Sequence, residues 1–262
     1  MKPSESKENL VFDYHTIRLL IGVIALSFPW VVSILASRIA PSISWSYHTD
    51  AHDIFVGFLF VIGAFLASYK GHKPTLHKND VGKFWNWVSK FWKGAINFRI
   101  WERKHEEDLV SWVGGVAAWV TAVYPTAFCV ENACPPDPTS TIHYIGATVL
   151  ISTTVYFCLV AFRSRAYAKR KAEGLLGKGG NDPKNLRIRF YSFCGWGIAA
   201  IMLGSVVVAS TGFDAISNII FWAEAAALEL FGIGWLIASQ YLPVFTDEAE
   251  RQKLFVNWKN LE

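Results

Sequence analysis

The sequence predicts an all-α protein that crosses a membrane as a bundle of six helices. Hydrophobic residues make up 52% of the 262-residue chain and charged residues only 18%, whereas charged residues supply about a quarter of an average globular protein. The apolar residues also fall in runs close to the roughly 20 residues needed to cross a bilayer. The predicted spans are Ile17–Ala36, His52–Tyr69, Leu109–Val130, Tyr144–Phe162, Phe190–Ala209 and Ile216–Ser239.

The basic residues lie almost entirely on one side of these spans. Of the 25 Lys and Arg residues, nine fall in 70–108, nine in 163–189, three before the first span or in its first turn, and three after residue 240. Arg38 is the one basic residue in the three remaining loops. By the positive-inside rule, the N-terminus (1–16), the basic loop 163–189 and the tail (241–262) are cytoplasmic, and residues 17–240 form the transmembrane domain. In a bacterium this would be the cytoplasmic membrane.

The net charge of +4 is too small to indicate a nucleic-acid partner. The basic loop instead carries a juxtamembrane cluster of the kind that attracts anionic lipid head groups, in addition to setting topology. Its members are Arg163, Arg165, Lys169, Arg170 and Lys171.

Residues 81–101, between the second and third spans, predict an amphipathic helix. Trp and Phe side chains fall on one half of its helical wheel and Lys side chains on the other. This pattern is typical of a helix lying in the interface of the inner leaflet. A helix packed against the bundle or against a partner subunit is the alternative.

A short stretch before the second span holds the densest group of titratable residues: His48, Asp50, His52 and Asp53. The two histidines are four residues apart, so on a helix they would share one face. That spacing suits a metal, a proton relay or a phosphate-like head group. The alternative is a helix start with Asp50 as N-cap, Asp53 at N3 and solvated histidines.

Topology brings further polar residues to the same, outer level. Tyr124 lies near the outer end of the third span, His143 opens the fourth, and Glu224 lies about two turns into the sixth. Together with the histidine–acid stretch they predict an outward-facing polar cavity. The cytoplasmic half of the spans has no comparable set of histidines and acids.

Glu229 is a second acid inside the sixth span, near the midplane. It lies five residues after Glu224, about 140° around the helix, so the two acids do not share a face. A carboxyl at this depth costs several kcal/mol unless it is protonated, paired or hydrated, and is a functional candidate. A structural hydrogen bond to a neighbouring helix is the alternative.

Four cysteines are present. Cys129 lies just before the outer loop after the third span and Cys134 lies within it, and their spacing permits a disulfide in an oxidising compartment. Cys158 and Cys194 lie within spans, where we expect them to be packing residues.

Three short motifs resemble the Frag/DRAM/Sfk group and related uncharacterised bacterial six-span proteins. They are Pro41–Ser44 after the first span, Asp53–Gly57 opening the second, and Ile142–Ala147 opening the fourth. The resemblance implies six helices with a conspicuous histidine, here His143, at the start of helix four. The group includes autophagy modulators and a Golgi protein of GPI-anchor lipid remodelling, so the resemblance also implies a role connected with lipids.

Three function classes remain open. The favoured one is a non-catalytic membrane protein that binds a lipid, or a lipid-processing protein partner, through the outer cavity, alone or as a homo-oligomer. The second is a zinc-dependent intramembrane lipid hydrolase with His48, His52 and His143 as ligands; no cofactor is predicted under the first class. The third is a proton- or ion-coupled carrier that uses Glu224 and Glu229.

Overall fold

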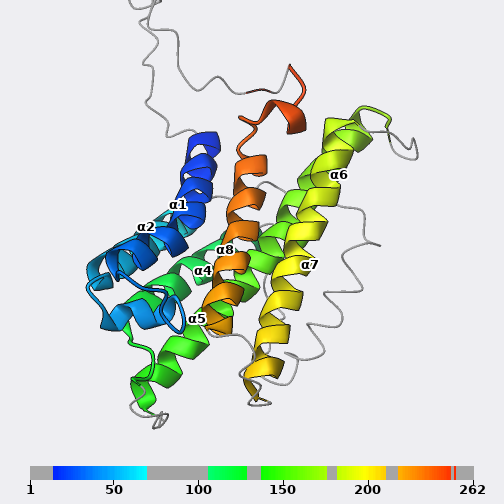
Figure 1. Cartoon of the computed structure of the whole chain (residues 1–262). Helices are drawn as coiled ribbons and strands as arrows, with labels where there is room; N and C mark the ends of the chain where they lie inside the picture. The colour runs from blue at the N-terminus through cyan, green and yellow to red at the C-terminus, as the bar shows by residue number, and fades with distance from the viewer. Residues whose placement is uncertain are drawn as a thin grey trace, which may run out of the picture.

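The computed structural model describes residues 14–69, 106–128, 137–175, 182–210, 218–248 and 251. Within them the protein is all-α, with six helical rods (Figure 1). The fourth rod is continuous, because α5 passes through a π-helical segment, η2 (Phe157–Phe162), into α6 (Arg163–Ala172). The other elements are α1 (Tyr14–Leu35), α2 (His52–Ser68), α4 (Glu106–Val123), α5 (Pro138–Tyr156), α7 (Pro183–Ser210), α8 (Ile219–Ala238) and the 3₁₀ turns η1 (Ser44–His48) and η3 (Pro243–Phe245).

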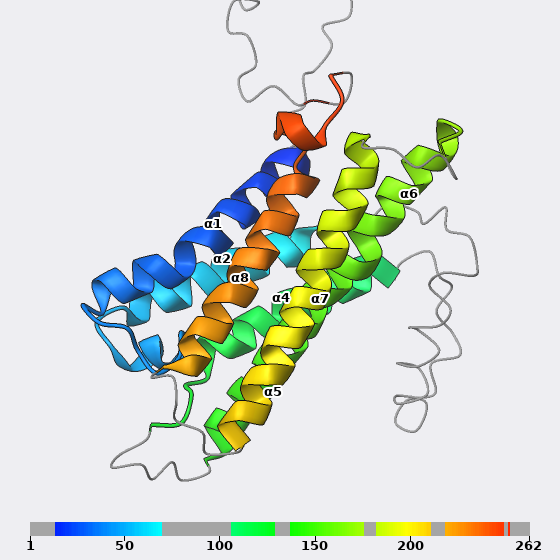
Figure 2. The ribbon, with the colours of Figure 1, turned by 45° about the vertical axis from the view of Figure 1, so that its right-hand side comes forward.

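The rods form a ring in sequence order. Each packs against the next, α5 packs against α7, and α8 closes the ring against α1 (Figure 2). Successive rods run in opposite directions, so the chain alternates between two ends. We call the end with His48 and His143 the histidine end, and the end with Arg18 and Arg165 the basic end.

In the described part of the chain, four helices are long and apolar enough to cross a membrane: His15–Leu35, Pro138–Ala172, Pro183–Val208 and Ile219–Ala238. Helix α2 is equally apolar but shorter. Large apolar side chains also point outward along the rods, including Val23, Trp196 and Leu203, which are 50%, 60% and 69% exposed. A surface of this kind is typical of a protein that faces lipid.

The rods approach one another through glycines. A Cβ on Gly115 of α4 would lie 2.6 Å from the Gly63 carbonyl oxygen of α2. A Cβ on Gly232 of α8 would lie 2.9 Å from the Gly22 carbonyl oxygen of α1. Glycine pairs at these two interfaces therefore allow backbone-to-backbone packing, as is common between helices in membranes.

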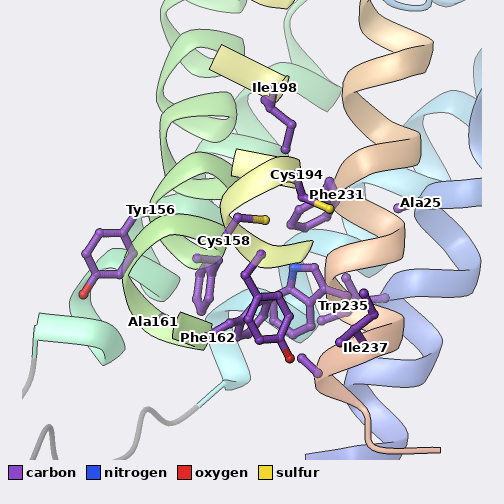
Figure 3. Packing of buried hydrophobic residues seen from close by; sticks show 14 of the residues in the cluster. Ala25, Tyr156, Cys158, Ala161, Phe162, Cys194, Ile198, Phe231, Trp235 and Ile237 are labelled. Atoms are coloured by element: carbon purple, nitrogen blue, oxygen red, sulfur yellow. The ribbon is translucent and has the colours of Figure 1, made fainter. Parts of the chain in front are cut away.

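The main core lies toward the basic end and surrounds Trp235, which is fully buried (Figure 3). Four aromatic rings pack on its indole at centroid distances of 5.2–5.8 Å: Tyr69 at the end of α2, Phe157 and Phe162 of η2, and Phe231 of α8 itself. Cys158 and Cys194 are free thiols buried in this core. Their prediction as packing residues is confirmed.

Helix boundaries follow local chemistry more closely than hydropathy. Helix α5 begins at Pro138 and not at Tyr144, because the Asp137 carboxylate caps it by accepting from the Thr139 and Ser140 N–H groups and proline suits the first helical position. Helix α4 ends at Val123, seven residues before the predicted end, because Pro125 disfavours helix in the residue before it.

The prediction of 163–189 as a loop is wrong for most of its length. Residues 163–172 continue the fourth rod as α6, and 183–189 form the first turns of α7. Ion pairs hold the two together: Arg170 with Asp182 at 3.0 Å, and Lys184 with Glu173 at 2.6 Å. The interfacial helix 81–101 and the cysteines Cys129 and Cys134 lie outside the described residues, so these predictions stay predictions.

Candidate functional site

The loop between α1 and α2, residues 36–51, folds over the histidine end and is tied to the start of α8. The Phe221 N–H donates to the Pro41 carbonyl at 3.1 Å, and the Asn218 side-chain amide donates to the Ile39 carbonyl at 3.5 Å. Two of the motifs that carry the family resemblance, Pro41–Ser44 and Ile142–Ala147, therefore lie at the same end of the bundle.

Glu224 anchors this loop. Its Oε2 accepts a hydrogen bond from the Ile43 N–H, with 2.5 Å between the two atoms. Ile43 is itself buried, only 3% exposed. The carboxyl that sequence reasoning placed in a polar cavity is thus engaged by backbone, where it fixes the position of the 36–51 loop on the bundle.

His48 and His143 hold the segment after α4 from two sides. His48 Nε2 lies 2.8 Å from the Thr126 carbonyl oxygen, and His143 Nδ1 lies 2.7 Å from that of Tyr124. Because a carbonyl oxygen can only accept, each of these ring nitrogens carries the hydrogen. Tyr124 therefore contributes its carbonyl to the site and not its phenol.

His143 is completely buried. Its second ring nitrogen, Nε2, has no hydrogen-bond partner within the described part of the chain. A buried imidazole with one nitrogen committed to a carbonyl and the other enclosed is well suited to fixing a loop.

His52 and Asp53 face outward, away from this set. The two side chains contact each other at 3.0 Å, with 42% and 98% of their surfaces exposed. Tyr47 packs edge-on against the His52 ring at 4.5 Å. An ion pair this exposed adds little stability, so the pair is open to contacts outside the chain.

The capping alternative for this stretch is wrong in its details. The N-cap of α2 is Ala51, which makes no side-chain cap, so Asp53 is at N2 and Asp50 precedes the cap. The Thr49 hydroxyl accepts from the Ala51 N–H at 3.1 Å, a local turn contact just before the helix and not a helix cap. Asp50 itself is exposed.

The three histidines do not form a ligand set for zinc. Each points a ring nitrogen at a different partner, namely the Thr126 carbonyl, the Asp53 carboxylate and the Tyr124 carbonyl. Among the described residues no group of three His, Cys, Asp or Glu side chains is arranged to hold a metal ion.

An aromatic–cationic patch at the same end was missed as a unit. The Arg38 guanidinium lies over the Trp45 ring, 4.7 Å from its centroid, and Trp45 stacks on Phe128 at 6.3 Å. Phe128 is 54% exposed and Arg38 is exposed as well. The sequence set Arg38 apart as the one basic residue of the outer loops, but Phe128 reaches the patch only because α4 ends early.

The basic end carries a charged network that sequence reasoning also missed. The Tyr69 hydroxyl accepts from Arg18 at 3.3 Å and from Arg165, and Arg165 also pairs with Glu107. Arg18 additionally donates to the Ala238 carbonyl at 3.1 Å. These bonds join α1, α2, α4 and α6 to one another and to the end of α8. The sequence prediction considered only histidines and acids within the spans and therefore missed this network.

The histidine end therefore consists of inner side chains bonded to loop backbone and an outer set that faces away from the bundle. The inner set is His48, His143 and Glu224, and the outer set is Arg38, Trp45, Phe128, His52 and Asp53. Comparison with family models, curated proteins and solved structures finds no match for this chain.

Proposed function

We propose that the chain is an integral membrane protein with six spans. Beyond the four long apolar helices, α2 and α4 carry outward apolar side chains: Phe60 is 43%, Trp112 55% and Val123 53% exposed. These helices have 17 and 18 residues, and roughly 17 residues is the shortest length that spans a bilayer. Their position in the ring between α1 and α5 supports the same depth for all six rods.

The basic end is the cytoplasmic end in this proposal. The α1 start, the α6 end and the α7 start lie there with most of the described Lys and Arg residues, and α8 ends there. Arg38 is the exception at the histidine end. This asymmetry follows the positive-inside rule and puts the histidine end outside.

At the outer end we propose that the protein binds a lipid, or a lipid-processing partner, without catalysing a reaction. The observation that carries this proposal is the exposed patch of Arg38, Trp45 and Phe128. A guanidinium binds phosphate through several donors, and aromatic rings favour the membrane interface. The inner His48, His143 and Glu224 hold the loops that position this patch.

The resemblance to the Frag/DRAM/Sfk group supports the same direction. Its motif residues have supporting roles at the histidine end: Pro41 accepts from α8, Ile43 donates to Glu224 and His143 donates to the segment after α4. The lipid connection of that group is an expectation for this chain.

Native mass spectrometry of the full chain in mild detergent tests the proposal. We expect wild-type protein to retain an added anionic phospholipid, and Arg38→Gln to retain at least about fivefold less. Asp50→Asn, an exposed change at the same end, is the matched control and should not reduce retention. Equal retention by Arg38→Gln and wild type would place the head group elsewhere and contradict the proposal.

A further inference from the structure

Glu229 lies in the middle of α8 and opens onto the outside of the bundle. It is ten residues from Ile219 and nine from Ala238, roughly 14 to 15 Å from either helix end at 1.5 Å per residue. It lies where α1 and α8 pack side by side (Figure 2). We call this line of contact the α1–α8 seam. Glu224, by contrast, is turned toward the 36–51 loop.

One tryptophan bonds to this carboxyl, and a second packs on the first. Trp30 Nε1 donates to Glu229 Oε1 at 2.7 Å, in an exposed hydrogen bond. Trp30 and Trp222 are 48% and 41% exposed, and their rings meet edge to face at 6.4 Å. Trp30 is the one hydrogen-bond partner that Glu229 has among the described residues, so its Oε2 remains available.

A carboxyl at this depth in hydrocarbon costs several kcal/mol unless it is protonated or paired. One hydrogen bond from an indole N–H satisfies one of the roughly four acceptor positions of a carboxylate. Lipid head groups lie at the interface, roughly 15 Å away, and cannot reach it. A complementary group that reaches this depth would belong to another membrane-embedded segment.

We propose that the α1–α8 seam binds a membrane-spanning helix of a partner protein, with a Lys or Arg side chain near the middle of that helix paired to Glu229. Charge complementarity identifies the partner. Within the described residues, the α1–α8 face of a second copy would not supply the cation, since the basic residue of α1, Arg18, lies at the basic end and is bonded to Ala238 and Tyr69. α8 contains no Lys or Arg.

This inference rests on the proposed membrane placement of α1 and α8, and not on lipid binding at the histidine end. A loss of lipid retention in Arg38→Gln and a loss of helix binding at Glu229 are separate results. Each proposal can therefore fail without the other.

The test uses the full chain in lipid bicelles and two synthetic helices of about 20 Leu and Ala residues. One helix has a single Lys at its centre and the other has Leu there. Energy transfer between dyes on protein and peptide measures binding. We expect the Lys helix to bind wild type about tenfold more tightly than the Leu helix.

Glu229→Gln should abolish this preference, because the amide keeps an acceptor for Trp30 but carries no charge. Glu224→Gln is the matched control: it changes the other acid of α8, which faces the loop, and should leave the preference intact. An unchanged unfolding temperature of Glu229→Gln would show that the bundle is preserved.

Equal binding of the two helices to wild type would overturn the proposal, as would a Lys preference that persists in Glu229→Gln. Self-association of the chain that depends on Glu229 would also overturn it, in favour of a second copy that shares a proton between two carboxyls.

Discussion

The two ends of the bundle use polar side chains in opposite ways. At the histidine end, His48, His143 and Glu224 each bond to backbone groups of loops. At the basic end, Arg18, Tyr69, Arg165 and Glu107 bond mainly to one another. The first arrangement positions loops on a formed bundle, whereas the second joins the helices that form it.

This difference predicts how each end fails. Losing a side-chain-to-backbone bond at the histidine end releases a loop and leaves the helices packed. Losing one member of the charged network leaves its partner as an uncompensated charge in a mostly buried place. This should lower the free energy of unfolding by more than the loss of a loop hydrogen bond at the histidine end. The comparison can be tested in order of expected effect.

The largest effect should come from Arg165→Leu. The change removes the guanidinium that neutralises Glu107, whose side chain is only 9% exposed, and we expect a loss of about 3 kcal/mol in the free energy of unfolding. Reversible denaturant unfolding in detergent measures it. The double variant Arg165→Leu with Glu107→Leu should recover more than half of the loss, because it leaves no buried charge; an equal or greater loss would contradict the ion-pair explanation.

A smaller and more local effect is expected for Glu224→Leu. Losing this acceptor leaves the buried Ile43 N–H without its hydrogen bond, which should weaken the loop by about 2 kcal/mol and give roughly thirtyfold faster hydrogen exchange at that amide. Glu224→Gln keeps an acceptor and should show a smaller increase. Exchange at amides in the middle of α7 should not change, and a matching increase there would mean that Glu224 stabilises the bundle as a whole.

The smallest effect concerns the cap of α5, outside the predicted spans. Hydrogen bonds from the Thr139 hydroxyl and from the Thr139 N–H lower the pKa of Asp137 below its ordinary value of 3.8. The folded state therefore binds this proton less readily than the unfolded state, so the cap is intact above about pH 4 and is lost as the pH falls below 3.8 through the lowered pKa.

Hydrogen exchange at the Thr139 and Ser140 amides, corrected for the intrinsic effect of pH, should accelerate over that acidic range. Asp137→Ala should show fast exchange at every pH. A pH-independent rate in wild type would show that the carboxylate does not cap the helix.

The sequence predicted the helices better than it predicted their polar contacts. The second span, His52–Tyr69, matches α2 to within one residue, because an apolar run with a polar stretch before it leaves little choice. The starts of α5 and α7 were missed because Pro138 and Pro183 begin helices whose first turns are polar, and hydropathy does not register such turns.

The candidate site was predicted in part. His48, His143 and Glu224 do meet at one end, as alternating spans require. Their partners were not predictable, since Thr126, Tyr124 and Ile43 take part through backbone groups that every residue possesses. Phe128 became part of the outer patch only because α4 stops at Val123.

Composition and hydropathy alone predicted the all-α fold of the described residues and where most of their helices lie, because an apolar run long enough to form such a helix is a local property of the sequence. The tertiary structure decided whether each titratable group faces a loop, a neighbouring charge or the outside. That choice depends on helix rotation and on where loops cross the bundle ends. For the same reason two acids five residues apart on α8 have separate surroundings, Glu224 under a loop and Glu229 on the outer seam.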